Sequence, residues 1–190
     1  MIYHNNSYRN NLMRLGFIGS GQITKAVING LLSSKLKFSK IYISRRNLKI
    51  STELGKKNKK IFVSENNQKI IDNSDWIFLA ITPNVGNKIL KKLKFKKKHT
   101  IISFISTIKM KDLKKFIKVK AHIIRAIPLP PISIKKGPVP IYPPNKKVKN
   151  FFNKLGDVIE IKKENLSLNF WTTSSMMAPF YEILQTLSLW

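Results

Sequence analysis

Short apolar runs alternate with longer amphipathic stretches along most of the chain. Short apolar runs predict buried strands, whereas apolar residues that recur every three or four positions predict helices. The predicted strands are Leu15–Ile18, Ile41–Ile43, Ile61–Val63, Trp76–Ile81, Ile101–Ile105 and Ile123–Ile127, and the predicted helices are 22–36, 48–56, 66–73, 83–93 and 109–117. Strands that are apolar throughout and separated by helices are typical of a parallel sheet covered on both faces. The pattern therefore predicts a doubly wound α/β domain.

This rhythm changes at a proline-rich segment, residues 128–144. Proline has no backbone N–H to donate, so we expect an extended loop or an edge strand there and no helix. A helix (146–155), a strand (158–161) and an apolar helical stretch from about Asn165 follow. The last stretch is too apolar to stand alone in water. It must pack on the sheet domain, on another subunit or on further sequence.

The first predicted strand runs into Gly19-Ser20-Gly21, and a helix follows. Gly19 permits a tight turn, and Gly21 lets the backbone approach a pyrophosphate with no Cβ in the way. The helix N-terminus offers free N–H groups and a positive dipole end to phosphates. Thr24 stands where a third Gly or Ala is typical, so the packing of helix on strand is less closely specified there. The motif predicts a dinucleotide-binding Rossmann domain, and a glycine turn without a ligand is the alternative.

The second predicted strand ends at Ser44-Arg45-Arg46. A site specific for NAD usually places an acidic residue here for the ribose 2′-hydroxyl, and this chain has no acid before Glu53. A hydroxyl and two guanidinium groups suit a 2′-phosphate instead. We therefore favour NADP(H) over NAD(H), with two exposed surface arginines as the alternative.

The fourth predicted strand ends at Ala80–Pro83, where proline opens a helix. This loop lies at the carboxyl edge of the sheet, where cofactors bind in such folds, although a purely structural turn fits the residues equally well. The three segments together predict the cofactor-binding residues. They are Gly19, Ser20, Gly21, Gln22, Ile23, Ser44, Arg45, Arg46, Ala80, Ile81, Thr82 and Pro83.

Composition adds a formal charge of +27, from 36 Lys and Arg against 9 Asp and Glu. Only five of these cations are Arg, the residue that a nucleic-acid surface favours, and Lys is spread along the whole chain. We interpret the charge as a compositional bias of the surface and expect no nucleic-acid partner. A basic nucleic-acid binder remains an alternative. The charge would still attract anionic ligands, including a phosphorylated cofactor.

The chain has no Cys, which excludes disulfides and thiolate catalysis, and its three His lie far apart in the sequence. We therefore expect no metal site. The polar N-terminus lacks a signal-peptide core, and no apolar stretch has the ~20 residues that span a bilayer. These observations favour a cytoplasmic protein without a membrane partner.

The order of these segments resembles the pyrroline-5-carboxylate reductase family. Residues 13–26 are similar to its opening strand, glycine loop and helix, and residues 74–83 to its "sDvIfLAvkP" segment, with Thr82 replacing Lys. Residues 125–131 resemble its "RxMPNTP" loop, with Leu129 and Pro130 replacing Asn and Thr. Residues 175–181 fall where the family carries "SGSGPAY", with Met176, Met177 and Ala178 replacing Gly, Ser and Gly.

The resemblance implies two regions. Residues 13–162 would be an NADP-binding Rossmann domain, and 163–190 the incomplete start of an all-helical dimerisation and substrate domain. Residues 1–12 precede the first predicted strand, and we interpret them as a disordered extension, with an error in the assigned start site as the alternative. The resemblance also implies an oxidoreductase of proline biosynthesis that transfers hydride from NADPH to a cyclic imine, and a homodimer or higher oligomer. For the substrate carboxylate it implies Ser175 and Thr172 as catalytic-site donors, with Thr173 and Ser174 as neighbours. Hydroxyls that face helix carbonyls or solvent are the alternative.

Two further functional hypotheses remain open. The altered loop at Leu129 and Pro130 favours an NADP-dependent oxidoreductase that acts on a different imine or carbonyl acid. The end of the chain at Trp190, within an apolar stretch, is the reason to consider a cofactor-binding protein without catalysis.

Overall fold

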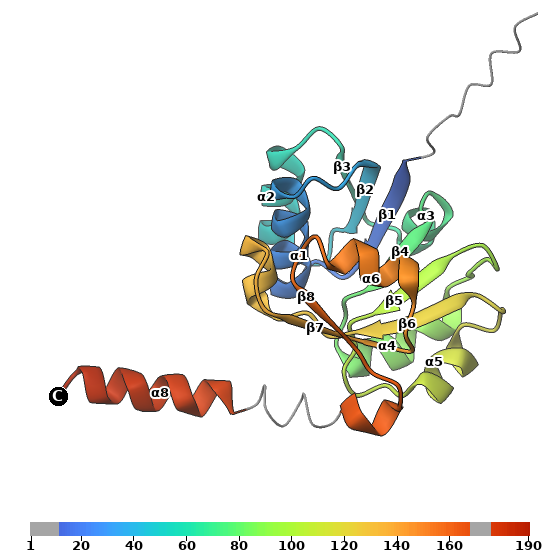
Figure 1. The fold of residues 1–190 in the computed structure, drawn as a ribbon. Coiled ribbons are helices and arrows are strands. Elements are labelled where there is room, and N and C mark those ends of the chain that lie inside the picture. Colours follow the sequence, from blue (N-terminus) through green and yellow to red (C-terminus); the bar gives the residue numbers. More distant parts are fainter. Residues whose placement is uncertain (1–11, 168–175) are drawn as a thin grey trace, which may run out of the picture.

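A computed structural model describes residues 12–167 and 176–190 of the chain. In these residues eight strands form one sheet in the order β3-β2-β1-β4-β5-β6-β7-β8 (Figure 1). The strands are β1 (Met13–Ile18), β2 (Phe38–Ser44), β3 (Ile61–Ser64), β4 (Trp76–Leu79), β5 (Thr100–Ser103), β6 (His122–Ala126), β7 (Pro138–Tyr142) and β8 (Asp157–Glu160). The first six are parallel, β7 is antiparallel to β6, and β8 is parallel to β7. The chain order reverses direction at β1, where β2 and β4 lie on either side.

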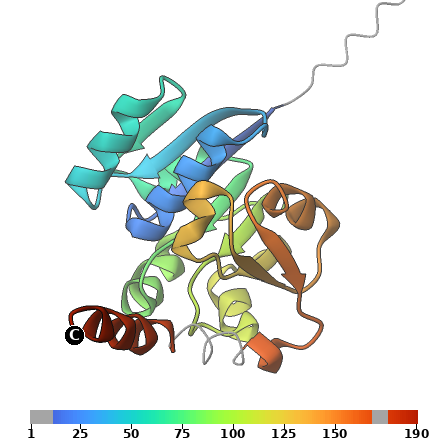
Figure 2. The ribbon, with the colours of Figure 1, turned by 60° about the vertical axis from the view of Figure 1, so that its left-hand side comes forward.

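Helices cover both faces of this sheet (Figures 1 and 2). The apolar side chains of α1, α2 and α6 join one buried cluster, and those of α3, α5 and the short helix η1 join the other. The helices are α1 (Gln22–Ser33), α2 (Leu48–Lys57), α3 (Asn67–Asp72), α4 (Pro83–Ile89), η1 (Leu90–Lys92), α5 (Met110–Phe116), η2 (Pro130–Ile134), α6 (Lys146–Phe152), η3 (Glu164–Leu166) and α8 (Met177–Ser188). Two apolar layers on one sheet confirm the doubly wound α/β prediction.

The central strands explain why their sequences are apolar throughout. Phe17 of β1 and Phe78 of β4 are register partners, and their rings stack at 4.4 Å on the face covered by α1 and α6. Their neighbours Ile18 and Leu79 point to the opposite cluster. All four side chains are fully buried. A strand buried on both sides has no position left for a polar residue.

The proline-rich segment differs from the prediction in two ways. Residues 130–134 form the short 3-10 helix η2, although we expected no helix, because its prolines occupy the first two positions, where a backbone donor is not required. Residues 138–142 form β7, which lies between β6 and β8 and is therefore not an edge strand. Because β7 runs antiparallel to β6, the sheet is mostly parallel rather than wholly parallel.

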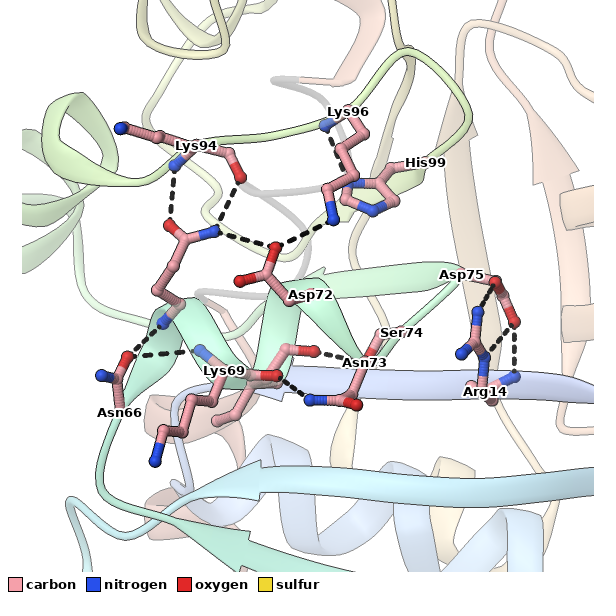
Figure 3. Close-up of polar contacts among 12 residues, drawn as sticks. Arg14, Asn66, Lys69, Asp72, Asn73, Ser74, Asp75, Lys94, Lys96 and His99 are labelled. Atoms are coloured by element: carbon pink, nitrogen blue, oxygen red, sulfur yellow. Dashed lines mark hydrogen bonds and ion pairs between the residues drawn. The ribbon is translucent and has the colours of Figure 1, made fainter.

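The amino-terminal edge of the sheet carries closely paired charges (Figure 3). Asp75, just before β4, accepts hydrogen bonds from Nε and Nη2 of Arg14 at 3.0 and 2.6 Å. These bonds hold the pKa of the Asp75 carboxyl below its usual value. Nearby, Lys96 pairs with Asp72 at 3.0 Å, and burial lowers the pKa of His99. Asp72 and Asp75 at this edge are therefore each held by a cation of the protein.

The C-terminal stretch forms a helix, α8, as expected. Its apolar side chains are exposed, including Ile183 (57%), Leu187 (65%) and Trp190 (104%). In Figure 1 α8 extends away from the sheet. The prediction that residues 163–190 begin a separate helical domain stays a prediction. Within the described residues, no helix combines the length and apolar character needed to cross a membrane.

Candidate functional site: a nucleotide cleft at the carboxyl edge of the sheet

The turn between β1 and α1 requires glycine at its first position. Gly19 has φ +113°, in the left-handed region that side chains avoid, and a Cβ there would collide with the carbonyl oxygen of Ala80. Ala80 itself is fixed by its N–H, which donates to Ile18 at 2.8 Å. The β1 and β4 loops therefore touch, and they do so at the point where the strand order reverses. Ligands of open α/β sheets bind at this place.

Gly21 leads into α1 and faces open space. A Cβ built at Gly21 has no atom within 4 Å, and no side chain caps the N-terminus of the helix. The backbone N–H groups of the first turn are consequently available to a ligand, with the positive end of the helix dipole behind them. The absence of a Cβ keeps their approach clear, as the sequence predicted.

Three hydroxyl groups hold this turn in place. Ser44 accepts a hydrogen bond from the Gly19 N–H at 2.7 Å, Thr24 donates to the Gly19 carbonyl at 2.9 Å, and Ser20 accepts from the Asn47 N–H at 2.9 Å. All three side chains are buried. Ser44 thus positions the glycine turn, and its role as a phosphate ligand stays a prediction. Thr24, which we treated as a departure from the motif, connects the first turn of α1 to the glycine turn through this hydrogen bond.

Two adjoining cavities open above these loops, one of about 540 Å³ and one of about 390 Å³. Gly19, Arg46 and Ile81 line both, so the two cavities form one cleft. The larger is lined by Gly19, Ser20, Gly21, Arg46, Asn47, Leu48, Ala80, Ile81 and Thr82, and the smaller by Gly19, Ser44, Arg45, Arg46, Glu65, Asn67, Ile81, Val85, Lys88 and Ile89. Most of the predicted cofactor residues therefore meet in one cleft. Gln22, Ile23 and Pro83 lie beside it and do not line it.

The smaller cavity is strongly basic. Arg45, Arg46 and Lys88 line it, with Glu65 as its acidic residue, and Glu65 forms an ion pair with Arg45. Within the described residues, the side chains of Arg46 and Lys88 make no hydrogen bond or ion pair. The sequence analysis missed Glu65 and Lys88. Glu65 could have been found, because it directly follows a parallel strand and such positions meet at one edge of a sheet.

The structure does not test the residues that we predicted to hold the substrate. Ser175, Thr172, Thr173 and Ser174 lie outside the described residues. Arg125, near the end of β6, is 3% exposed and donates to Glu164 of η3 and to the Ser106 carbonyl, both at 2.5 Å. The same Glu164 oxygen accepts from the Met110 N–H at 2.7 Å. Arg125 therefore fastens η3 to the sheet domain.

The chain is similar in sequence to known oxidoreductases. The family model "NADP oxidoreductase coenzyme F420-dependent" matches residues 14–107. Pyrroline-5-carboxylate reductase 3 of Danio rerio is 29% identical over 128 residues, which are 66% of this chain and 44% of that protein. These matches support membership of this NADP-linked oxidoreductase family and a resemblance to the pyrroline-5-carboxylate reductases. The resemblance seen in the sequence is thus confirmed. The matched part of the chain covers less than half the length of the Danio rerio relative.

Solved structures of pyrroline-5-carboxylate reductases share the fold of this chain. The pyrroline-5-carboxylate reductase of Coxiella burnetii superposes with a TM-score of 0.76 at 22% identity, over 93% of this chain and 69% of that one. The Plasmodium falciparum pyrroline carboxylate reductase, solved with NADP bound, gives a TM-score of 0.72 at 21% identity, over 92% of this chain and 66% of that one. At these identities the likeness establishes the Rossmann-like architecture.

Proposed function

We propose that the cleft binds NADPH and that the protein is an NADPH-dependent reductase of a cyclic imine, as in pyrroline-5-carboxylate reduction. One observation carries the proposal: an uncapped helix N-terminus and a glycine turn open onto a cleft lined by Arg46 and Lys88, which form no ion pair among the described residues. The N–H groups at Gly21 and the first turn of α1 suit a pyrophosphate. Arg45, Arg46 and Lys88, about the smaller cavity, suit a 2′-phosphate.

The larger cavity would take the nicotinamide half of the cofactor. Its wall at Ala80, Ile81 and Thr82 combines backbone polar groups with an apolar side chain. When bound, the nicotinamide supplies a hydride to the carbon of a protonated C=N bond, and the nitrogen keeps its proton as the amine forms. This chemistry asks the chain for orientation and for exclusion of water rather than for a strong base. Ser175 and Thr172 are proposed as hydroxyl donors to the substrate carboxylate.

A second candidate reaction rests on the loop that follows β6. Leu129 and Pro130 stand where the family loop carries Asn and Thr, and Leu129 precedes η2 with extended backbone. Loss of two polar side chains favours a less polar imine or a carbonyl acid as substrate. A substrate panel monitored by NADPH absorbance separates the two reactions.

The decisive experiment for the cofactor is a fluorescence titration of the purified chain with NADPH and with NADH. We expect NADPH to bind more tightly, and we expect the difference to shrink as salt is raised, because exposed cations provide it. Binding of neither nucleotide would overturn the proposed function. Tight nucleotide binding without turnover of pyrroline-5-carboxylate would leave the cofactor site and remove the reaction.

We also propose self-association through α8. Its exposed apolar side chains, such as Phe180, Ile183 and Leu187, form a surface that a second copy would bury. Light scattering should give the mass of a dimer or larger species, and Leu187→Asp should shift it toward the monomer. An unchanged mass would count against α8 as the interface.

A further inference from the structure

The basic cavity contains a carboxylate placed against its cations. Arg45 follows β2 and Glu65 follows β3, and these two strands pair with Ser44 opposite Ser64. The Arg45 N–H donates to the Ser64 carbonyl at 3.0 Å, which fixes the two chain ends side by side. Strand register therefore places Arg45 and Glu65 at neighbouring backbone positions, so their side chains lie within reach of each other.

The ion pair between Arg45 and Glu65 lies within reach of solvent. The side chains are 52% and 71% exposed, so the pair is stabilised only weakly and can exchange partners. Among the described residues lining this cavity, Glu65 is the one acid, against Arg45, Arg46 and Lys88. A ligand phosphate that binds Arg45 here must therefore compete with Glu65 for the guanidinium, and it lies close to a negative charge.

We propose that Glu65 is a specificity-determining residue that reduces the preference of this site for NADP(H) over NAD(H). The inference rests on the proposed function and deepens it. With a 2′-phosphate, Glu65 competes for the Arg45 guanidinium and repels the ligand. With a 2′-hydroxyl, Glu65 can accept a hydrogen bond and keeps its ion pair. We therefore expect a weaker preference for NADPH over NADH than the two arginines after β2 suggest from the sequence alone.

The test compares Glu65→Gln with Glu53→Gln. Glu53 lies on α2, pairs with Lys25 and Lys57 at 2.7 and 3.3 Å, and lines neither cavity. Both substitutions remove one negative charge, so the control reports the effect of net charge alone. We expect Glu65→Gln to tighten NADPH binding by about two- to fivefold relative to Glu53→Gln, with NADH binding unchanged or weaker.

Two adenosine ligands isolate the 2′-phosphate from the nicotinamide half. Calorimetry with adenosine 2′,5′-bisphosphate should show the same gain in Glu65→Gln, and adenosine 5′-monophosphate should show none. Equal effects of Glu65→Gln and Glu53→Gln on the ratio of the NADPH and NADH dissociation constants would overturn the inference while leaving nucleotide binding intact. Failure of the unaltered chain to bind either nucleotide would instead overturn the proposed function, and this inference with it.

Discussion

At the edge where the parallel strands begin, two acids are held in ion pairs: Arg14 donates two side-chain hydrogen bonds to Asp75, and Lys96 pairs with Asp72. At the edge where the strands end, the side chains of Arg46 and Lys88 line a cavity and, among the described residues, form no ion pair. A cation that lines a cavity without a partner attracts anions more strongly than one held in an ion pair does. Because lysines such as Lys118 and Lys120 line another cavity at the start of β6, basic charge alone does not mark a site, and the glycine turn and the open helix end beside Arg46 distinguish the cleft.

The largest expected effect concerns the ion pair between the buried Arg125 and the partly exposed Glu164. Glu164→Ala removes the carboxylate facing Arg125, which is 3% exposed, and should lower the free energy of unfolding by about 3 kcal/mol in urea denaturation. Glu164→Gln keeps an acceptor for the Met110 N–H and should cost less. A loss below about 1 kcal/mol for Glu164→Ala, which is the range of an exposed pair, would show that this contact does not fasten η3 to the domain.

The two glycines of the turn should fail in different ways. Gly19→Ala forces a Cβ against Ala80 at φ +113°, so it should lower stability by about 1–3 kcal/mol and abolish nucleotide binding. Gly21→Ala places its Cβ in open space and should weaken NADPH binding about tenfold, with less than about 1 kcal/mol lost in stability. Thermal melts and titrations on the same samples check both. Unchanged NADPH affinity in Gly21→Ala would remove the phosphates from this helix end.

Reversal of one unpaired cation tests the cleft directly. Arg46→Glu should weaken NADPH binding about tenfold or more, because a cation lining both cavities becomes a repelling anion. Lys154→Glu changes the net charge equally at an exposed position after α6 and should leave the NADPH dissociation constant nearly unchanged. Equal weakening by the two variants would indicate general attraction by a basic protein rather than a site.

The smallest effect belongs to the opposite edge and depends on pH. Arg14 lowers the folded-state pKa of Asp75, so the folded state holds this proton less tightly than the unfolded state does. The pair therefore stabilises the protein fully above the ordinary pKa of aspartate, and that contribution is lost as the pH falls through the lowered value. Because the Asp75 side chain is 37% exposed, Asp75→Asn should cost less than about 1 kcal/mol at neutral pH. The difference from the unaltered protein should vanish in acid, and a difference independent of pH would contradict the assignment.

The sequence predicted most of the fold because its signals were local. Strands such as β4 are apolar on both faces, and Pro83 marks the first turn of α4. The 3-10 helix η2 was missed because the prolines that disfavour a long helix are harmless in a first turn. In the cleft, the glycines were readable because backbone geometry demands them. The position of Glu65 after a parallel strand was readable as well, but its placement beside Arg45 was not, because that comes from the register of β3 beside β2, which is a relation between distant residues.

The hydroxyl groups around the glycine turn carry a consequence for the energetics of association. Ser44, Thr24 and Ser20 fix the turn through three separate elements, β2, α1 and the β2–α2 loop, with no ligand taking part. The conformational entropy of this loop is thus lost when the chain folds, so nucleotide binding does not carry the free-energy cost of ordering it. We therefore expect a rigid, preorganised cradle, and affinity differences among nucleotides that arise mainly from their rates of escape.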